Sequence, residues 1–379
     1  MARIPAKPIT AIAVLLILVL AGSLRLAHLS TESVDGDELF SRRAATAEPA
    51  KAWAMIQKDL VHPPLYYFLL RSTIPGGDES TAVDLRRLSL AAGVTAILAV
   101  VLVGYATPEL AASALLAALL LAINRTHIFY SQQARSYALY TALVALLLLW
   151  RVFADRYGRT LWYWIGGTAL MAAIVWTHYV GALFCAACVL PMGFMDYGSG
   201  RGWRARALPF GSLLVAALLF LPWLVPEIAV YRQKAGFAEN LDWQGLPTLY
   251  DLKMIFADYV GVPRLPGATT AAFALMAFLV GCAFWLRPLP ARQNSSRLDV
   301  RVSMAAMALA PPLLIWLATR RPLQLPIFGE RHLLPAVAPA LMLMSYGLMR
   351  LASLAGRPVY RTALLAGSAI ILCAFQIAP

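Results

Sequence analysis

The chain has 379 residues, of which 60% are hydrophobic and only 13% are charged. Soluble domains contain about 25% charged residues, so this composition excludes an ordinary soluble protein and indicates an integral membrane protein. The net charge of +13 does not indicate nucleic-acid binding, because membrane proteins concentrate arginine and lysine in their cytoplasmic loops.

Eleven apolar runs, each of about 15 to 22 residues, follow one another along the chain. A hydrocarbon core about 30 Å thick needs roughly 20 helical residues, so the runs predict an all-α, polytopic membrane protein with about eleven transmembrane helices. They lack the alternation of an outer-membrane β-barrel. The runs cover residues 8–24, 88–108, 110–124, 136–150, 160–177, 179–195, 207–226, 265–286, 302–319, 333–349 and 362–379.

The first run is interpreted as a retained helix, because it is long and lacks a clear signal-peptide cleavage site. Arg3 and Lys7 then hold the N-terminus inside, and alternation of sides places short, arginine-rich loops on that same side. We expect a single transmembrane module over residues 1–379, with a large first outer loop at 28–87 and a second outer loop at 227–264.

The first outer loop contains the segment "HPPLYYFLLRSTIPGG", residues 62–77. Its apolar part has only about a dozen residues, which is too short to cross a bilayer. We therefore predict a juxtamembrane helix here, beginning at Pro63-Pro64, because proline suits the first turn of a helix.

Acidic and basic side chains gather at the outer ends of the predicted helices. The stretch "VDGDELF", residues 34–40, supplies Asp37 and Glu38, and "FYSQQARSYALY", residues 129–140, surrounds Arg135 with amides and phenols. A planar guanidinium with five donors suits a phosphate oxygen, and a carboxylate can take a proton from an attacking hydroxyl. This face therefore predicts a phosphate-bearing substrate beside a general base, although any single charge there can also be a solvated juxtamembrane residue.

Six short motifs occur in a fixed order: "DE" (37–38), "HPPLYY" (62–67), "RRLSLAAG" (86–93), "YSQQARSYAL" (130–139), "THYVG" (177–181) and "RHLLP" (331–335). In this order and spacing the chain resembles the bacterial dolichyl-phosphate-mannose-protein mannosyltransferase-like glycosyltransferases of family 39, within the GT-C superfamily. The chain departs from the family pattern at Gln133, where an acidic residue is common.

The resemblance implies a GT-C-type bundle whose helical first outer loop carries the catalytic acid. It implies a polyprenyl-phosphate-linked sugar donor and an inverting transfer on the periplasmic face of the bacterial inner membrane. Asp37 matches the general base and Glu38 its partner. Arg86, Arg135 and Arg331 match positions suited to the donor phosphate. The other matched motif positions are His62, Tyr66, Tyr137, His178 and His332.

No cofactor is required by this interpretation. A divalent ion is compatible with Glu38, His62 and His178, but no ligand spacing demands one. The acceptor stays open among protein hydroxyls, lipid-linked glycans and cell-wall polymers. Two alternatives from other classes are a transporter or flippase of a lipid-linked sugar and an inactive scaffold, but the chain lacks the two repeated halves of many transporters.

Overall fold

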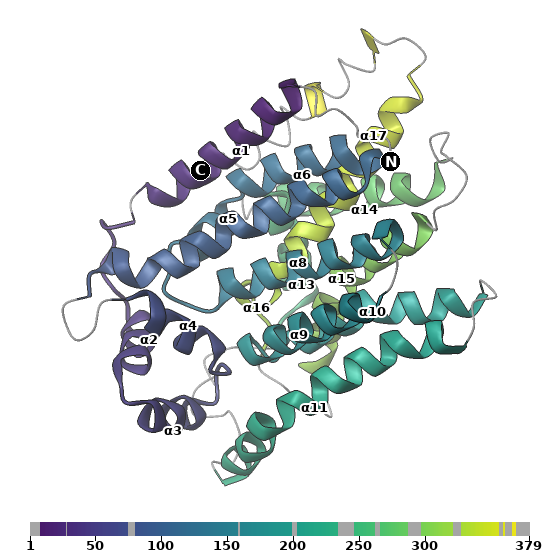
Figure 1. Cartoon of the computed structure of the whole chain (residues 1–379). Coiled ribbons are helices and arrows are strands. Elements are labelled where there is room, and N and C mark those ends of the chain that lie inside the picture. The colour runs from purple at the N-terminus through teal and green to yellow at the C-terminus, as the bar shows by residue number, and fades with distance from the viewer. Residues whose placement is uncertain are drawn as a thin grey trace.

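The structure is a computed structural model that describes residues 8–27, 29–74, 80–157, 160–198, 203–233, 246–261, 266–286, 297–320, 327–355, 359–360 and 366–368. Within these ranges it is a bundle of helices without a strand (Figure 1). Most of the last expected run, 362–379, lies outside the described residues.

The first ten predicted runs each coincide with a helix. These helices are α1 (Pro8–Leu26), α5 (Ala82–Ala106), α6 (Ala111–Ile123), α8 (Tyr137–Tyr157), α9 (Leu161–Thr177), α10 (Gly181–Gly198), α11 (Trp203–Gln233), α14 (Pro266–Trp285), α15 (Arg297–Ala318) and α17 (Val337–Ser353). By length and composition, five helices of the described chain can cross a membrane, or six if a bent pair counts as one span. Four shorter apolar helices accompany them.

The bent pair is a broken helix. Helix α6 ends at Asn124, and α7 (Arg125–Ser131) continues at an angle of 62°. The Asn124 side chain caps α7 by accepting from the backbone N–H of His127, at 2.9 Å. The break exposes the last carbonyls of α6, and Arg25 at the end of α1 donates to those of Leu121 and Ala122.

Burial separates an interior helix from a peripheral one. In the most apolar window of the span Glu330–Ser353, which includes α17, 94% of the residues are buried inside the protein. The corresponding share for α11 is 22%, and α11 lies along one side of the bundle (Figure 1). Helix α11 keeps Pro209, Pro222 and Pro226 inside it and extends to Gln233. Helix α11 thus includes the first residues of the segment expected as a second outer loop, 227–264, and α13 (Leu249–Val260) lies within that segment.

The first outer loop folds into three short helices, α2 (Gly36–Thr46), α3 (Pro49–Asp59) and α4 (Leu65–Thr73), which gather at one end of the bundle (Figure 1). Helix α4 follows Pro63-Pro64, as expected. Its nine residues extend about 14 Å, which is less than half of a hydrocarbon core.

Aromatic side chains attach this loop to the bundle. Trp53 of α3 packs edge-on against Trp223 of α11, with ring centroids 4.9 Å apart, and lies 6.1 Å from the ring of Trp176 in α9. Tyr66 and Tyr67 of α4 are buried in the same region. Large apolar surfaces are therefore buried between the loop helices and α9 and α11, and this burial fixes the place of Asp37.

Candidate active site

The residues expected from the motifs all lie at the end of the bundle that carries α2 to α4. Each is held near the end of an element or in a connection, where backbone direction changes. The positions are Asp37 and Glu38 in the first turn of α2, His62 before α4, Tyr66 in α4, Arg86 near the start of α5, Arg135 between α7 and α8, Tyr137 at the start of α8, His178 between α9 and α10, and Arg331 and His332 in α16 (Glu330–Leu333).

Glu38 and Arg86 form a buried ion pair behind the site. Arg86 Nε donates to Glu38 Oε1 at 2.8 Å, and Arg86 Nη2 donates to Oε2 at 2.6 Å. Glu38 also accepts from the backbone N–H groups of Ala134 at 2.7 Å and Asp35 at 3.4 Å. One carboxylate therefore joins α2, α5 and the connection that carries Arg135.

Arg86 has no donor left for a substrate. Its Nη1 donates to the carbonyls of Leu29 and Glu32, and its Nη2 donates to that of Ser33 in addition to Glu38. A guanidinium has five N–H groups, and these bonds occupy all of them. These contacts do not favour the expected role of Arg86 at the donor phosphate; Arg86 instead holds the segment that leads into α2.

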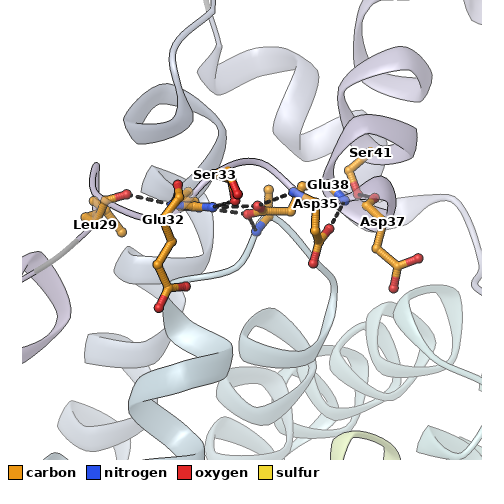
Figure 2. A network of polar contacts seen from close by, with 9 residues as sticks. Leu29, Glu32, Ser33, Asp35, Asp37, Glu38 and Ser41 are labelled. Atoms are coloured by element: carbon orange, nitrogen blue, oxygen red, sulfur yellow. Dashed lines mark hydrogen bonds and ion pairs between the residues drawn. The ribbon is translucent and has the colours of Figure 1, made fainter.

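Asp37 presents an exposed carboxylate beside this network. Its backbone carbonyl accepts from Arg135 Nη1 and from Ser41 Oγ, both at 3.1 Å. Its side chain is 56% exposed, and Oδ2 lies 3.7 Å from Arg135 Nη2. Figure 2 shows the carboxylate pointing away from the hydrogen bonds around Glu38. The backbone of Asp37 is thus fixed, while its acidic group remains accessible to a substrate.

Arg135 is a buried cation with an incomplete set of partners. It is 4% exposed, and its Nη2 lies 3.3 Å from His62 Nδ1. Its Nε has no hydrogen-bond partner among the described residues. Ser89 Oγ, which contacts Tyr66 at 3.0 Å, donates to the Arg135 carbonyl at 3.2 Å. A buried charge is costly unless an anion compensates it, so this position favours binding of a negative group.

Three histidine rings surround Tyr137 beside Arg135. The rings of His62 and His178 lie 5.2 Å apart, and those of His178 and His332 lie 5.1 Å apart. Tyr137 stands 5.3 to 6.2 Å from all three rings. Its hydroxyl and His62 Nε2 are buried without a hydrogen-bond partner among the described residues, as Arg135 Nε is. Polar atoms of Arg135, His62 and Tyr137 are therefore buried close together in this cluster.

Electrostatics keeps these imidazoles neutral. Burial, with Arg135 and the other two histidines nearby, lowers the pKa of His62 well below its usual value. Burial, with Arg331 and Arg135, lowers the pKa of His178 to about 3. A positive charge on either ring would add to two guanidinium groups, so the pocket is positive through its arginines and not its histidines.

A divalent ion does not fit the carboxylate expected to hold it. The four lone-pair directions of Glu38 already face the two N–H groups of Arg86 and those of Ala134 and Asp35. In the described part of the chain, no group of three histidine, cysteine or acidic residues is placed to hold a metal. The contacts of Glu38 therefore do not fit the suggested binding of a divalent ion by Glu38, His62 and His178.

Three hydrogen bonds near this cluster were not expected from the sequence. Tyr130 donates to Glu330 Oε1 at 3.3 Å, which ties the α7 segment to α16. Tyr179 donates to Glu227 Oε1 at 2.8 Å and accepts from Trp223 Nε1 at 3.1 Å, which ties the α9–α10 turn to α11. In the sequence, these contacts could have been suspected because Glu330 directly precedes the motif residue Arg331 and Tyr179 directly follows the motif residue His178.

Comparisons with known proteins identify the fold. No family model matches the chain, and no curated protein does. The solved structure of ArnT from Cupriavidus metallidurans, bound to undecaprenyl phosphate, is similar with a TM-score of 0.60 at 13% identity, covering 94% of this chain and 63% of that one. The Archaeoglobus fulgidus oligosaccharyltransferase in its apo form gives a TM-score of 0.55 at 13% identity, covering 98% and 55%.

The same oligosaccharyltransferase tethered to an acceptor peptide with the NVT sequon gives a TM-score of 0.51 at 14% identity, covering 97% and 54%. The chain thus spans between 54% and 63% of the length of these solved proteins. The likeness confirms the expected GT-C-type helical bundle. Assignment to family 39 stays a prediction from the motifs.

Proposed function

We propose that this protein is an inverting membrane glycosyltransferase that moves a sugar from a polyprenyl-phosphate donor to an acceptor hydroxyl. The observation that carries the proposal is the pairing of an exposed carboxylate with a buried guanidinium: Asp37 Oδ2 lies 3.7 Å from Arg135 Nη2. A base and a phosphate-binding cation must both lie close to the reacting carbon in this reaction, because the bond that forms and the bond that breaks share that carbon.

In the proposed step Asp37 takes the proton of the acceptor hydroxyl. The acceptor oxygen attacks the anomeric carbon of the sugar, and the bond from that carbon to the phosphate oxygen breaks. The leaving polyprenyl phosphate keeps the electron pair. Arg135 and Arg331 offset the charge that grows on its oxygens, and the low-dielectric pocket strengthens this interaction.

Glu38 and Arg86 act in this mechanism through position. They hold the start of α2 against α5 and the connection before Arg135, with hydrogen bonds of 2.6 to 2.8 Å. This network fixes the distance between the base and the phosphate-binding arginine. Precise positioning of reacting groups contributes several kcal/mol to catalysis, roughly 7 to 11 kcal/mol in well-oriented systems.

The location of the site supports a lipid-linked donor. It lies at one end of a bundle of membrane-crossing helices, where a lipid carrier presents its phosphate while its chain stays in the bilayer. The similar ArnT structure is bound to undecaprenyl phosphate, which supports the same class of carrier here.

The sequence supports a side of the membrane for the site. The short connections that follow α8, α10, α14 and α17 are rich in arginine, and such connections favour the cytoplasmic side, so we place the site on the other side. In a bacterial inner membrane this is the periplasmic face.

The test is an assay of sugar release and transfer with purified protein in detergent. Radiolabelled polyprenyl-phosphate sugars would be offered one at a time to the wild type and to Asp37→Asn. We expect turnover of one donor by the wild type and a loss of at least about 100-fold in the variant, as general-base catalysis contributes about 10² to 10⁴.

The matched control is Asp35→Asn. Asp35 belongs to the same acidic cluster and caps α2 by accepting from Glu38 N–H at 2.7 Å, and asparagine caps a helix about as well. This variant should keep its activity. Full activity of Asp37→Asn would show that Asp37 is not the general base. A wild type that turns over no donor would overturn the glycosyltransferase assignment.

A further inference from the structure

The proposed mechanism does not use Tyr66, although Tyr66 belongs to the second motif. The residue lies in α4, its side chain is completely buried, and its hydroxyl lies 3.0 Å from Ser89 Oγ in α5. Its ring packs edge-on against Tyr67, with centroids 5.8 Å apart. A side chain enclosed in this way does not contact a substrate, so any effect of Tyr66 on catalysis must pass through Ser89.

The partners of Ser89 determine the direction of two consecutive hydrogen bonds. A carbonyl oxygen can only accept, so Ser89 Oγ donates its single proton to the Arg135 carbonyl, at 3.2 Å. Ser89 then offers only a lone pair to Tyr66, so the Tyr66 hydroxyl donates to Ser89 Oγ. Burial raises the pKa of Tyr66 above its ordinary value, so the phenol keeps the proton that it donates.

These two bonds connect α4, through α5, to the backbone of Arg135. The preceding backbone N–H, that of Ala134, donates to Glu38 Oε1 at 2.7 Å. The backbone is therefore held on both sides of the Arg135 Cα atom. Because the direction of a side chain follows from its backbone, these bonds contribute to placing Arg135 Nη2 3.7 Å from Asp37 Oδ2.

We propose that Tyr66 and Ser89 are positioning residues, which hold the backbone of Arg135 so that its guanidinium meets the phosphate of the lipid carrier. This inference rests on the proposed function for its ligand. It assigns a task to Tyr66 of the second motif and adds Ser89, which lies inside the third motif. Two hydrogen bonds thereby join these motifs to the fourth motif, which contains Arg135.

The first test measures the affinity for labelled undecaprenyl phosphate in detergent, together with kcat in the release assay. Ser89→Ala removes the donor to Arg135, and alanine favours the helix, so α5 should persist. We expect the affinity and kcat to fall about 3- to 10-fold, as for one neutral hydrogen bond, and by less in Tyr66→Phe, which leaves the Ser89 donor in place. The control is Thr95→Ala, because Thr95 of α5 donates within its own helix, to the Ala91 carbonyl at 2.8 Å, in an exposed position. This variant should match the wild type.

Two double variants separate positioning from a general packing defect. Tyr66→Phe added to Ser89→Ala should leave the affinity of Ser89→Ala unchanged, because the Tyr66 hydroxyl has already lost its acceptor. Arg135→Met replaces the guanidinium with an uncharged side chain. In that background Ser89→Ala should change the affinity less than about twofold, since no guanidinium remains to be misplaced. A packing defect would lower the affinity in both backgrounds.

The outcomes that contradict the inference are distinct. An equal loss of affinity from Ser89→Ala with and without Arg135→Met would show that Ser89 supports the fold in general and would overturn the positioning role. Wild-type affinity and kcat in a folded Ser89→Ala protein would overturn it as well. If Ser89→Ala does not fold, the same comparison is made with Tyr66→Phe, which keeps the buried ring. A wild type that binds no undecaprenyl phosphate would instead contradict the carrier in the proposed function, and the phosphate part of this inference with it.

Discussion

The guanidinium of Arg86 donates to both carboxylate oxygens of Glu38, at 2.8 and 2.6 Å, and both side chains are almost completely buried. The pair joins α2 to α5, which are separated by the rest of the first outer loop. Because Asp37 directly precedes Glu38, this pair determines where the proposed base stands. The chemistry at Asp37 therefore depends on two residues that need not touch the substrate.

The first prediction concerns Arg86→Lys. Lysine keeps the charge but loses the planar fork and several of the five hydrogen bonds, so Glu38 and three loop carbonyls lose partners. Breaking a buried pair costs about 3 to 5 kcal/mol, and retention of the charge places this variant near the lower value. We expect a lower apparent melting temperature in detergent and a reduced kcat, measured with the release assay.

Arg87→Lys is the adjacent control. The Arg87 side chain is 60% exposed and pairs with Asp84 at 2.9 Å on the helix surface. Exposed pairs contribute about 0 to 1 kcal/mol, so this variant should resemble the wild type. Equal stability of Arg86→Lys and Arg87→Lys would contradict the supporting role of the buried pair.

The second prediction concerns Arg135→Lys. The change removes the Nε donor that is buried without a partner and shortens the reach to His62. Hydrogen bonds to charged groups contribute about 1.5 to 3 kcal/mol, so affinity for undecaprenyl phosphate should fall about 10- to 100-fold. Arg135 also holds the Asp37 carbonyl, and kcat should fall as well.

Arg125→Lys is the comparison for this experiment. Arg125 lies at the exposed start of α7, the helix that leads to the connection with Arg135. A long-range effect of charge would be the same for both variants, because both keep a cation. Affinity is measured by binding of the labelled lipid. An unchanged affinity in Arg135→Lys would show that the Arg135 guanidinium does not bind the phosphate.

Sequence patterns predicted the helices well because a membrane imposes one length and one polarity on each span. Ten apolar runs became helices, and the short run after Pro63-Pro64 became the nine-residue α4. The end of α11 was missed, because the apolar run stops at the charged Glu227, whereas the helix continues to Gln233.

The site was predicted as a set of residues but not as a set of contacts. A motif shows that Arg86 and Arg135 are arginines at one face, and it does not show where their donors point. In the structure one guanidinium is saturated by the protein and the other keeps an unpaired Nε. Tyr130 and Glu330 lie 200 positions apart, so no local pattern could pair them.

The third prediction is a loss of stability in acid that depends on His178. Its folded pKa of about 3 lies below the ordinary value of 6.5, so between these values the unfolded chain binds a proton that the folded chain does not. The free energy of unfolding therefore falls as pH is lowered through this window, by at most about 1.4 kcal/mol per pH unit for one such group.

The measurement compares apparent melting temperatures of the wild type and His178→Gln between about pH 7.5 and pH 4.5. Glutamine does not titrate, so the decrease with falling pH should be shallower in the variant. His62, whose pKa is also lowered by burial, keeps part of the slope in both proteins. Parallel curves would show that His178 takes up its proton equally in the folded and unfolded states.

The last prediction concerns Gly93, the final residue of the third motif. A Cβ at this position would lie 2.2 Å from Ser131 Oγ and 3.0 Å from Arg25 Nε. Both neighbours belong to a buried cluster in which Arg25 holds His127 Nδ1 at 2.6 Å and supports the break between α6 and α7. We expect Gly93→Ala to destabilise the protein by about 1 to 3 kcal/mol through overpacking.

Gly22→Ala provides the matched comparison, because Gly22 is also in a membrane helix and a Cβ there would have nothing within 4 Å. Alanine in an open helical position stabilises by roughly 0.5 to 1 kcal/mol relative to glycine, so the two variants should shift the melting temperature in opposite directions. The activity of Gly93→Ala should also fall, since displacement of Ser131 moves the segment that leads to Arg135. A Gly93→Ala protein as stable and active as Gly22→Ala would show that α5 and α7 can separate without consequence for the site.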